Sequence, residues 1–176
     1  MARDRVIGTT GAAVLLLLAG FPLSLEGQAA PGPAERVATL TAGLGNAMGW
    51  LGAQGEGYFE GDRLSAFLGA GYTPPIESGD PSGPTFAAGL RGFTSGVKHR
   101  GFLEFSISQI FVETGFAPDL RRLYGPGIQA GYQFVSRGGF TLMASVGLGY
   151  APGVRDAESG VGGLLGLGAG YTWRRR

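Results

Sequence analysis

Apolar and polar side chains alternate with a period of two along most of the chain between residues 37 and 173. In the clearest case, every second residue from Phe140 to Tyr150 is apolar, and the positions between them hold Thr, Met, Ser or Gly. Successive side chains of a β-strand point to opposite faces of the sheet, so this period indicates strands and not helices. The pattern predicts eight strands, at 37–46, 50–59, 63–73, 85–94, 101–112, 128–134, 140–150 and 161–173.

The connections between these strands are alternately short and long. The short ones lie at 60–62, 95–100 and 137–139, the longer ones at 74–84, 113–126 and 151–160, and the exception is a short connection at 46–49. Consecutive hairpins of this kind form an up-and-down meander, and an even number of strands can close. Short turns on one rim and longer loops on the other are typical of transmembrane barrels. We therefore predict an all-β fold, an eight-stranded antiparallel up-and-down transmembrane β-barrel.

The distribution of charge indicates which face of this barrel points outward. A surface exposed to water is normally about 25–35% charged. The polar faces of the eight predicted strands carry only a few charged residues, and the remaining positions are mostly Gly, Ser, Thr and Gln. Such a face suits a narrow interior, and the apolar face then points into lipid. The charged residues concerned are Glu56, Arg63, Arg91 and Glu104.

These four charged residues should pair with one another inside the barrel, because an isolated buried charge is costly. We predict an ion-pair cluster in the lumen formed by Glu56, Arg91 and Glu104, with Arg63 nearer the periplasmic rim. An ion-conducting or gated lumen is the functional alternative. Eight strands enclose only enough space for side chains, which favours a polar plug.

The N-terminus is typical of a secretory signal peptide. Arg3 and Arg5 give a positive start, residues 14–21 are apolar, and small residues precede a predicted cleavage site after Ala29. The alternative is a membrane-anchoring helix, but Pro22 interrupts the apolar run well short of the ~20 residues that a spanning helix needs. The predicted organisation is a signal peptide at 1–29, a short linker at 30–36, the barrel at 37–173 and a basic tail at 174–176.

Composition excludes several kinds of function. The 176 residues include no cysteine and one histidine, so disulfides, thiolate metal sites and cysteine nucleophiles are excluded, and we expect no metal and no cofactor. The formal net charge of +1 argues against nucleic-acid binding. The 35 glycines suit close packing inside a small barrel, although compositional bias would also produce them.

The last predicted strand carries a further signal. It has an aromatic residue at Trp173, another at Tyr171 and a glycine at Gly168. By this strand, the strand count and the alternation of loops, the chain resembles the small eight-stranded outer-membrane β-barrels, the OmpA/OmpX-like architecture, over roughly residues 35–173. Two features differ from that family: Arg174–Arg176 follow the aromatic residue, and Gly166 stands where a polar residue is expected.

This resemblance implies a location and partners. The protein would lie in the outer membrane of a Gram-negative-type cell, in contact with outer-membrane lipid and lipopolysaccharide. The barrel-assembly machinery would recognise Gly168, Tyr171 and Trp173 as a signal during biogenesis. We also expect a monomer.

The favoured function is structural or interactive: envelope integrity, adhesion or surface recognition, without catalysis. Arg121 and Arg122, in a predicted long loop, could contact lipopolysaccharide phosphates or lie in a solvated loop. One alternative is an exported soluble barrel of lipocalin type, which binds a small apolar ligand. Another is an enzyme that modifies lipid A, but the only histidine, His99, has no recognisable serine partner in Ser95 or Ser106.

Overall fold

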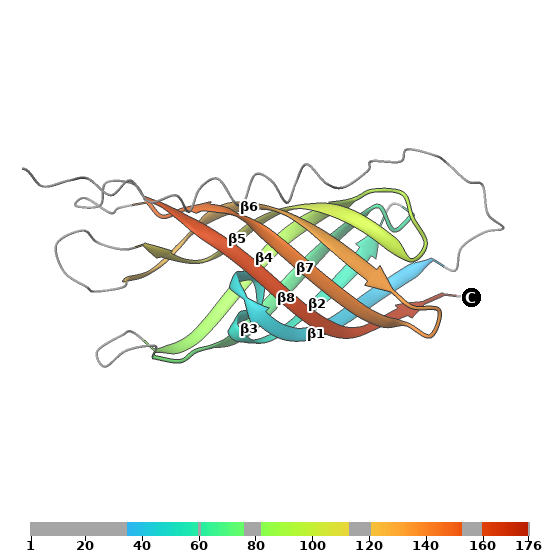
Figure 1. Ribbon diagram of the computed structural model, residues 1–176, viewed down its shortest axis with the longest axis horizontal. Helices are drawn as coiled ribbons and strands as arrows, with labels where there is room; N and C mark the ends of the chain where they lie inside the picture. The colour runs from blue at the N-terminus through green and yellow to red at the C-terminus, as the bar shows by residue number, and fades with distance from the viewer. Residues whose placement is uncertain (1–34, 60, 76–81, 113–120, 153–159, 176) are drawn as a thin grey trace, which may run out of the picture.

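The computed structural model describes residues 35–59, 61–75, 82–112, 121–152 and 160–175. They form a closed barrel of eight strands, in which each strand pairs antiparallel with its sequence neighbours and β8 pairs with β1 (Figure 1). The predicted all-β, up-and-down barrel is therefore confirmed. The predicted signal peptide and most of the predicted linker lie outside the described residues.

The strands are close to those predicted, with differences at a few ends. Their bounds are β1 Arg36–Gly45, β2 Gly49–Phe59, β3 Leu64–Thr73, β4 Gly83–Phe93, β5 His99–Val112, β6 Arg121–Val135, β7 Phe140–Tyr150 and β8 Val161–Arg174. The largest difference is β6, which begins seven residues before the predicted Ile128. Gly125, Pro126 and Gly127 hid its alternation in the sequence, but the backbone there continues to pair with β5.

The two faces of the wall differ sharply in polarity. Apolar side chains point outward: Leu68 is 72% exposed, Leu165 65% and Phe86 62%. Most polar strand residues point inward, where Gln54, Ser65, Thr141 and others are almost fully buried. The predicted assignment of the apolar face to the outside is therefore confirmed.

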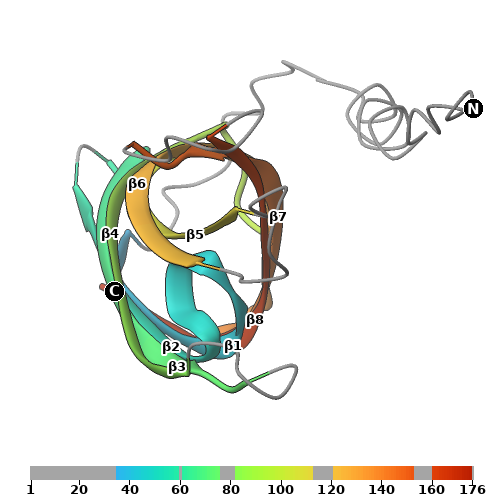
Figure 2. The ribbon, with the colours of Figure 1, turned by 90° about the vertical axis from the view of Figure 1, so that its left-hand side faces the viewer.

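The short connection between β1 and β2 lies inside the barrel. It forms a single 3-10 turn, η1 (Asn46–Met48), within the ring of strands (Figure 2). Met48 is completely buried, and Asn46 Nδ2 donates a hydrogen bond to the carbonyl oxygen of Gln109 on β5 at 2.7 Å. A Cβ atom on Gly69 would lie 1.8 Å from the Ala47 carbonyl oxygen, so only glycine allows η1 to sit there. The turn thus occupies part of the lumen, a feature that the sequence did not reveal, and we refer to it as the plug.

The wall is paired unevenly around its circumference. Fourteen residue pairs join β5 and β6. Only six join β4 and β5, from Phe93↔Phe102 to Ala88↔Ile107. Beyond that point residues 83–87 of β4 still pair with β3, and residues 108–112 of β5 still pair with β6. The two strands diverge toward the end of the barrel that carries the longer connections (Figure 1). We refer to this divergence as the β4–β5 seam.

The position of η1 inside the barrel can be tested with a pair of glycine substitutions. Gly69→Ala should lower the free energy of unfolding by about 1–3 kcal/mol, because the new methyl group overlaps the Ala47 carbonyl. Gly57→Ala is the matched control, since a Cβ atom there meets nothing within 4 Å. Denaturant-induced unfolding of both variants is the measurement. Equal stability of the two would contradict the position of η1.

Candidate functional site

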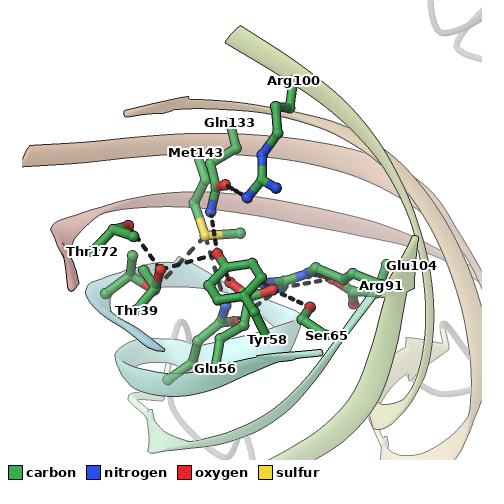
Figure 3. Close-up of polar contacts among 12 residues, drawn as sticks. Thr39, Glu56, Tyr58, Ser65, Arg91, Arg100, Glu104, Gln133, Met143 and Thr172 are labelled. Atoms are coloured by element: carbon green, nitrogen blue, oxygen red, sulfur yellow. Dashed lines mark hydrogen bonds and ion pairs between the residues drawn. The ribbon is translucent and has the colours of Figure 1, made fainter. Parts of the chain in front are cut away.

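The most distinctive chemistry of the molecule is a charged network in the lumen, with Arg91 of β4 at its centre (Figure 3). Arg91 is 1% exposed, and its Nε and Nη2 atoms lie 2.8 and 2.7 Å from Glu104 Oε2. Its Nη1 atom lies 3.3 Å from Glu56 Oε1, an ion pair without hydrogen-bond geometry. Nη2 also donates to Gln54 Oε1 at 3.1 Å. The structure thus brings together Glu56, Arg91 and Glu104, as predicted.

Neighbouring side chains satisfy the remaining oxygen atoms of the two carboxylates. Ser65 donates to Glu56 Oε1 at 2.5 Å, and the Tyr58 hydroxyl donates to Glu56 Oε2 at 3.0 Å. Gln129 Nε2 donates to Glu104 Oε1 at 2.8 Å. Buried ion pairs are tolerated when additional hydrogen bonds complete the geometry, and this cluster meets that condition.

Aromatic rings form the walls around Arg91. The Cζ atom of Arg91 lies 4.3 Å from the centroid of the Phe67 ring and 5.0 Å from that of Phe102. A guanidinium within about 6 Å of an aromatic face is attracted by the ring quadrupole. Sequence reasoning missed Phe67, because it lies between the apolar residues Ala66 and Leu68. Its place in the alternation, two residues after Ser65, is the signal that could have found it.

A second ion cluster lies nearer the end of the barrel at which β1 begins and β8 ends. Arg36 Nη1 lies 2.8 Å from Asp62 Oδ2, and Arg100 Nη1 lies 3.3 Å from Asp62 Oδ1. Arg100 also donates to the Asp62 carbonyl oxygen at 2.7 Å and stacks on Phe93 at 4.0 Å. Asp62 has a φ of 63°, next to Gly61 at 65°, so the β2–β3 turn places its carboxylate between two arginines.

Arg36 and Arg100 were not predicted as members of the site, for a clear reason. The sequence pattern placed Arg36 in the linker and Arg100 in a turn. The structure places both in strands, β1 and β5, with 4% and 1% of their surfaces exposed. Both residues lie at the margin of the alternation, where the sequence alone does not fix the end of a strand.

Hydrogen bonds join the two clusters into one network. Arg100 Nη2 donates to Gln133 Oε1 at 2.7 Å, and Gln133 Nε2 donates to the Tyr58 hydroxyl at 3.1 Å. Tyr58 in turn donates to Glu56, which reaches Arg91. The ion pairs of the network contain three arginines and three carboxylates, so its charges cancel when all six are ionised. Their mutual neutralisation allows these charges to be buried together.

Arg63 does not belong to the network, and the prediction that placed it there is wrong. Its side chain is exposed, because residues 61–63 form the β2–β3 turn and β3 begins only at Leu64. Arg121 and Arg122 were predicted in a loop. They instead lie in β6, paired with Val112 and Phe111, and the structure does not describe their side chains.

The residues of the predicted assembly signal all lie in β8. Tyr171 and Trp173 point outward and contact each other edge to face, with ring centroids 5.2 Å apart. Gly168 lies on the other face, where a Cβ atom would come within 3.1 Å of Met48 and 3.2 Å of Met143. Gly168 therefore leaves room for Met48 of η1 and for Met143 of β7.

His99 has aromatic neighbours. Its Nδ1 atom hydrogen-bonds the Tyr132 hydroxyl, and its ring lies 5.1 Å from that of Phe134 on the outer surface. Within the described ranges, no group of three or more His, Cys, Asp or Glu residues is placed to hold a metal ion. No helix in the same ranges is long and apolar enough to cross a membrane.

Comparison with known proteins gives no family for the chain. A scan against protein-family models and searches of curated proteins and of solved structures found no match.

The balance of charge around Arg91 can be tested by its removal. Arg91→Met should lower the free energy of unfolding by about 3–5 kcal/mol, because Glu56 and Glu104 would remain buried without their partner. The triple variant that also carries Glu56→Gln and Glu104→Gln should recover most of this loss. Equilibrium unfolding with denaturant measures both.

Leu148→Ala is a control for this prediction. Leu148 is 57% exposed on the outer face, so its truncation leaves no buried cavity and should cost less than Arg91→Met. Equal, small effects of Arg91→Met and Leu148→Ala would contradict the assignment of inner and outer faces.

Proposed function

We propose that the protein is an integral outer-membrane β-barrel with a plugged polar lumen and a structural or surface-interaction role. The observation that carries this proposal is the outer surface of the barrel. It combines an uninterrupted apolar band with two belts of aromatic residues, which is the surface that a bilayer requires.

The aromatic belts lie at the two ends of the strands. One belt lies near the end at which β1 begins and β8 ends, and it contains Phe59, Phe140, Tyr171 and Trp173. The other lies near the longer connections and contains Trp50, Tyr72, Phe86, Tyr124 and Tyr150. Between them, the outward positions of the described strands hold no Asp, Glu, Lys or Arg.

Phe140 and Tyr150 are the first and last residues of β7. At ~3.3 Å per residue and a tilt of ~40°, β7 rises about 25 Å, the height of the apolar band in outer-membrane barrels.

The lumen supports a plug in preference to a pore. Buried groups occupy it at three levels: η1 with Met48 toward the longer connections, the Arg91 network in the middle, and Arg36 and Arg100 toward the end where β1 begins. A soluble lipocalin-type barrel would need its apolar face inside, but here that face is outside. The lumen thus gives no support to that alternative.

Export and assembly complete the proposal. The predicted signal peptide would direct the chain out of the cytoplasm, and the strand that ends at Tyr171 and Trp173 would be recognised by the assembly machinery. The loops between β3 and β4, β5 and β6, and β7 and β8 would then face the outside of the cell and make the contacts of a surface protein.

A charge on the outer face distinguishes a membrane barrel from a soluble one. Leu68→Arg should lower the free energy of unfolding in phospholipid vesicles by about 2–4 kcal/mol, the cost of an arginine at mid-bilayer depth. In a soluble barrel the same change would be nearly neutral, because Leu68 is already 72% exposed. Ser95→Arg, in the exposed β4–β5 turn, is the matched control and should have little effect.

Cell fractionation gives the direct readout of location. The native protein should be enriched in the outer membrane and should migrate faster on a gel when it has not been boiled. A soluble periplasmic pool without this heat shift, together with a neutral Leu68→Arg, would overturn the proposal.

A further inference from the structure

The β4–β5 seam interrupts a wall that otherwise closes. The six residue pairs that join β4 and β5 rise only about 13 Å at ~3.3 Å per residue and a tilt of ~40°, less than the ~25 Å of the apolar band. Phe86 of β4 lies just beyond the last of these pairs, and Ile107 of β5 belongs to that pair. Each side chain is 62% exposed on the outer face. The seam therefore opens at a level where apolar side chains still face outward. Unpaired backbone groups are costly at that level unless something satisfies them.

Among the described residues, groups from β6 and η1 make hydrogen bonds at the seam. The Tyr124 hydroxyl reaches across from β6 and accepts a hydrogen bond from the Phe86 amide at 3.2 Å. On β5, Ser108, Gln109 and Ile110 are all buried in succession, and the Gln109 carbonyl accepts from Asn46 of η1. These contacts hold β5 toward η1, so that β4 and β5 remain separated at the seam.

Polar atoms without partners gather on the two strands that border the seam. Of the buried side-chain nitrogen and oxygen atoms in the described residues that lack a hydrogen-bond partner, four are on arginines. The other four are Thr85 Oγ1, Ser106 Oγ, Ser108 Oγ and Gln109 Nε2, all on β4 or β5. Three hydroxyls and an amide are uncharged groups, and they suit an uncharged, hydrogen-bonding ligand.

An apolar groove of about 910 Å³ adjoins the seam on the outer face. Next to the seam, the groove is bounded by Ala88 and Ile107, the last residue pair that joins β4 and β5. It continues past Phe105 to the small residues Gly55 and Gly57. A Cβ atom on either glycine would meet nothing within 4 Å, so the groove is open there. Its volume falls within the range of small-molecule sites.

We propose that the seam and the groove together bind a single-chain amphiphile with an uncharged, hydroxyl-bearing head group, of the monoacylglycerol class. The acyl chain lies in the groove on the outer face. The head group passes between β4 and β5 at the seam to the inner side of the wall, where it bonds the hydroxyls of Thr85 and Ser108. The inference rests on the proposed membrane location, because only there does the seam face hydrocarbon. A ligand with hydrogen-bonding groups at one end and an apolar tail satisfies both parts of the site.

Photolabelling tests the site directly. The full protein is reconstituted in phospholipid nanodiscs with a monoacylglycerol that carries a diazirine in its chain, then illuminated, and the adducts are mapped by mass spectrometry. Adducts should concentrate on the segments that contain Ala88, Phe105 and Ile107. Excess unlabelled monoacylglycerol should compete at least tenfold better than a lysophospholipid of the same chain length, whose head is charged.

Two outward glycines provide matched variants. Gly55→Leu fills the groove and should reduce labelling at least tenfold, whereas Gly163→Leu, at an equally open position on β8 outside the groove, should leave it unchanged. Ser108→Ala should weaken competition by the unlabelled monoacylglycerol several-fold without moving the adducts.

The outcomes separate this inference from the proposed function. Successful reconstitution with adducts spread evenly around the barrel would show only ordinary contact with bilayer lipid and would overturn the inference alone. Equal competition by the lysophospholipid would overturn the assignment of an uncharged head group. A chain that cannot be reconstituted at all would overturn both proposals.

Discussion

The burial of six charges in a narrow lumen is the constraint on which the rest of the structure depends. Arg91 lies between Glu56 and Glu104, and Asp62 lies between Arg36 and Arg100, so each cluster alone has an excess of one charge and only the pair is neutral. Gln133 and Tyr58 connect the two clusters by hydrogen bonds. Because the six residues come from β1, β2, β4, β5 and a turn, a shift of one residue in the register of these strands would move a charge to the outer face.

The glycines on the inner face follow from the same lack of space. Gly69 and Gly71 leave room for the carbonyl groups of η1, Gly168 leaves room for Met48 and Met143, and Gly89 leaves room for the ring of Phe67 that stacks on Arg91. A larger side chain at these positions would overlap backbone or a fixed ring. These inward-facing glycines are therefore tied to a lumen that must hold arginines, aromatic rings and a turn within one ring of eight strands.

The sequence was sufficient for the parts of the structure that depend on alternation. A period of two defines the strands, and the scarcity of charge on the polar face indicates that Arg91, Glu56 and Glu104 point inward. Alternation does not define the exact residue at which a strand begins or ends. For that reason Arg36 and Arg100 were missed as members of the charged network, and Arg63 was wrongly placed in it. Alternation also does not predict that Asn46–Met48 turns into the barrel or that β4 and β5 separate at the seam, because both depend on how distant segments pack in the lumen.

The plug and the seam are consequences of one arrangement of β5. Within this strand, Glu104 is bound to Arg91 of β4, where the two strands are still paired, and five residues later Gln109 is bound to Asn46 of η1, where they have separated. β5 cannot both contact η1 in the lumen and continue its ladder with β4 in the wall. The hydrogen bonds lost to β4 are replaced in part by η1 and by Tyr124, and β6 follows β5 to its end. The position of η1 in the lumen is therefore coupled to the gap between β4 and β5 in the wall, and this gap adjoins an apolar groove.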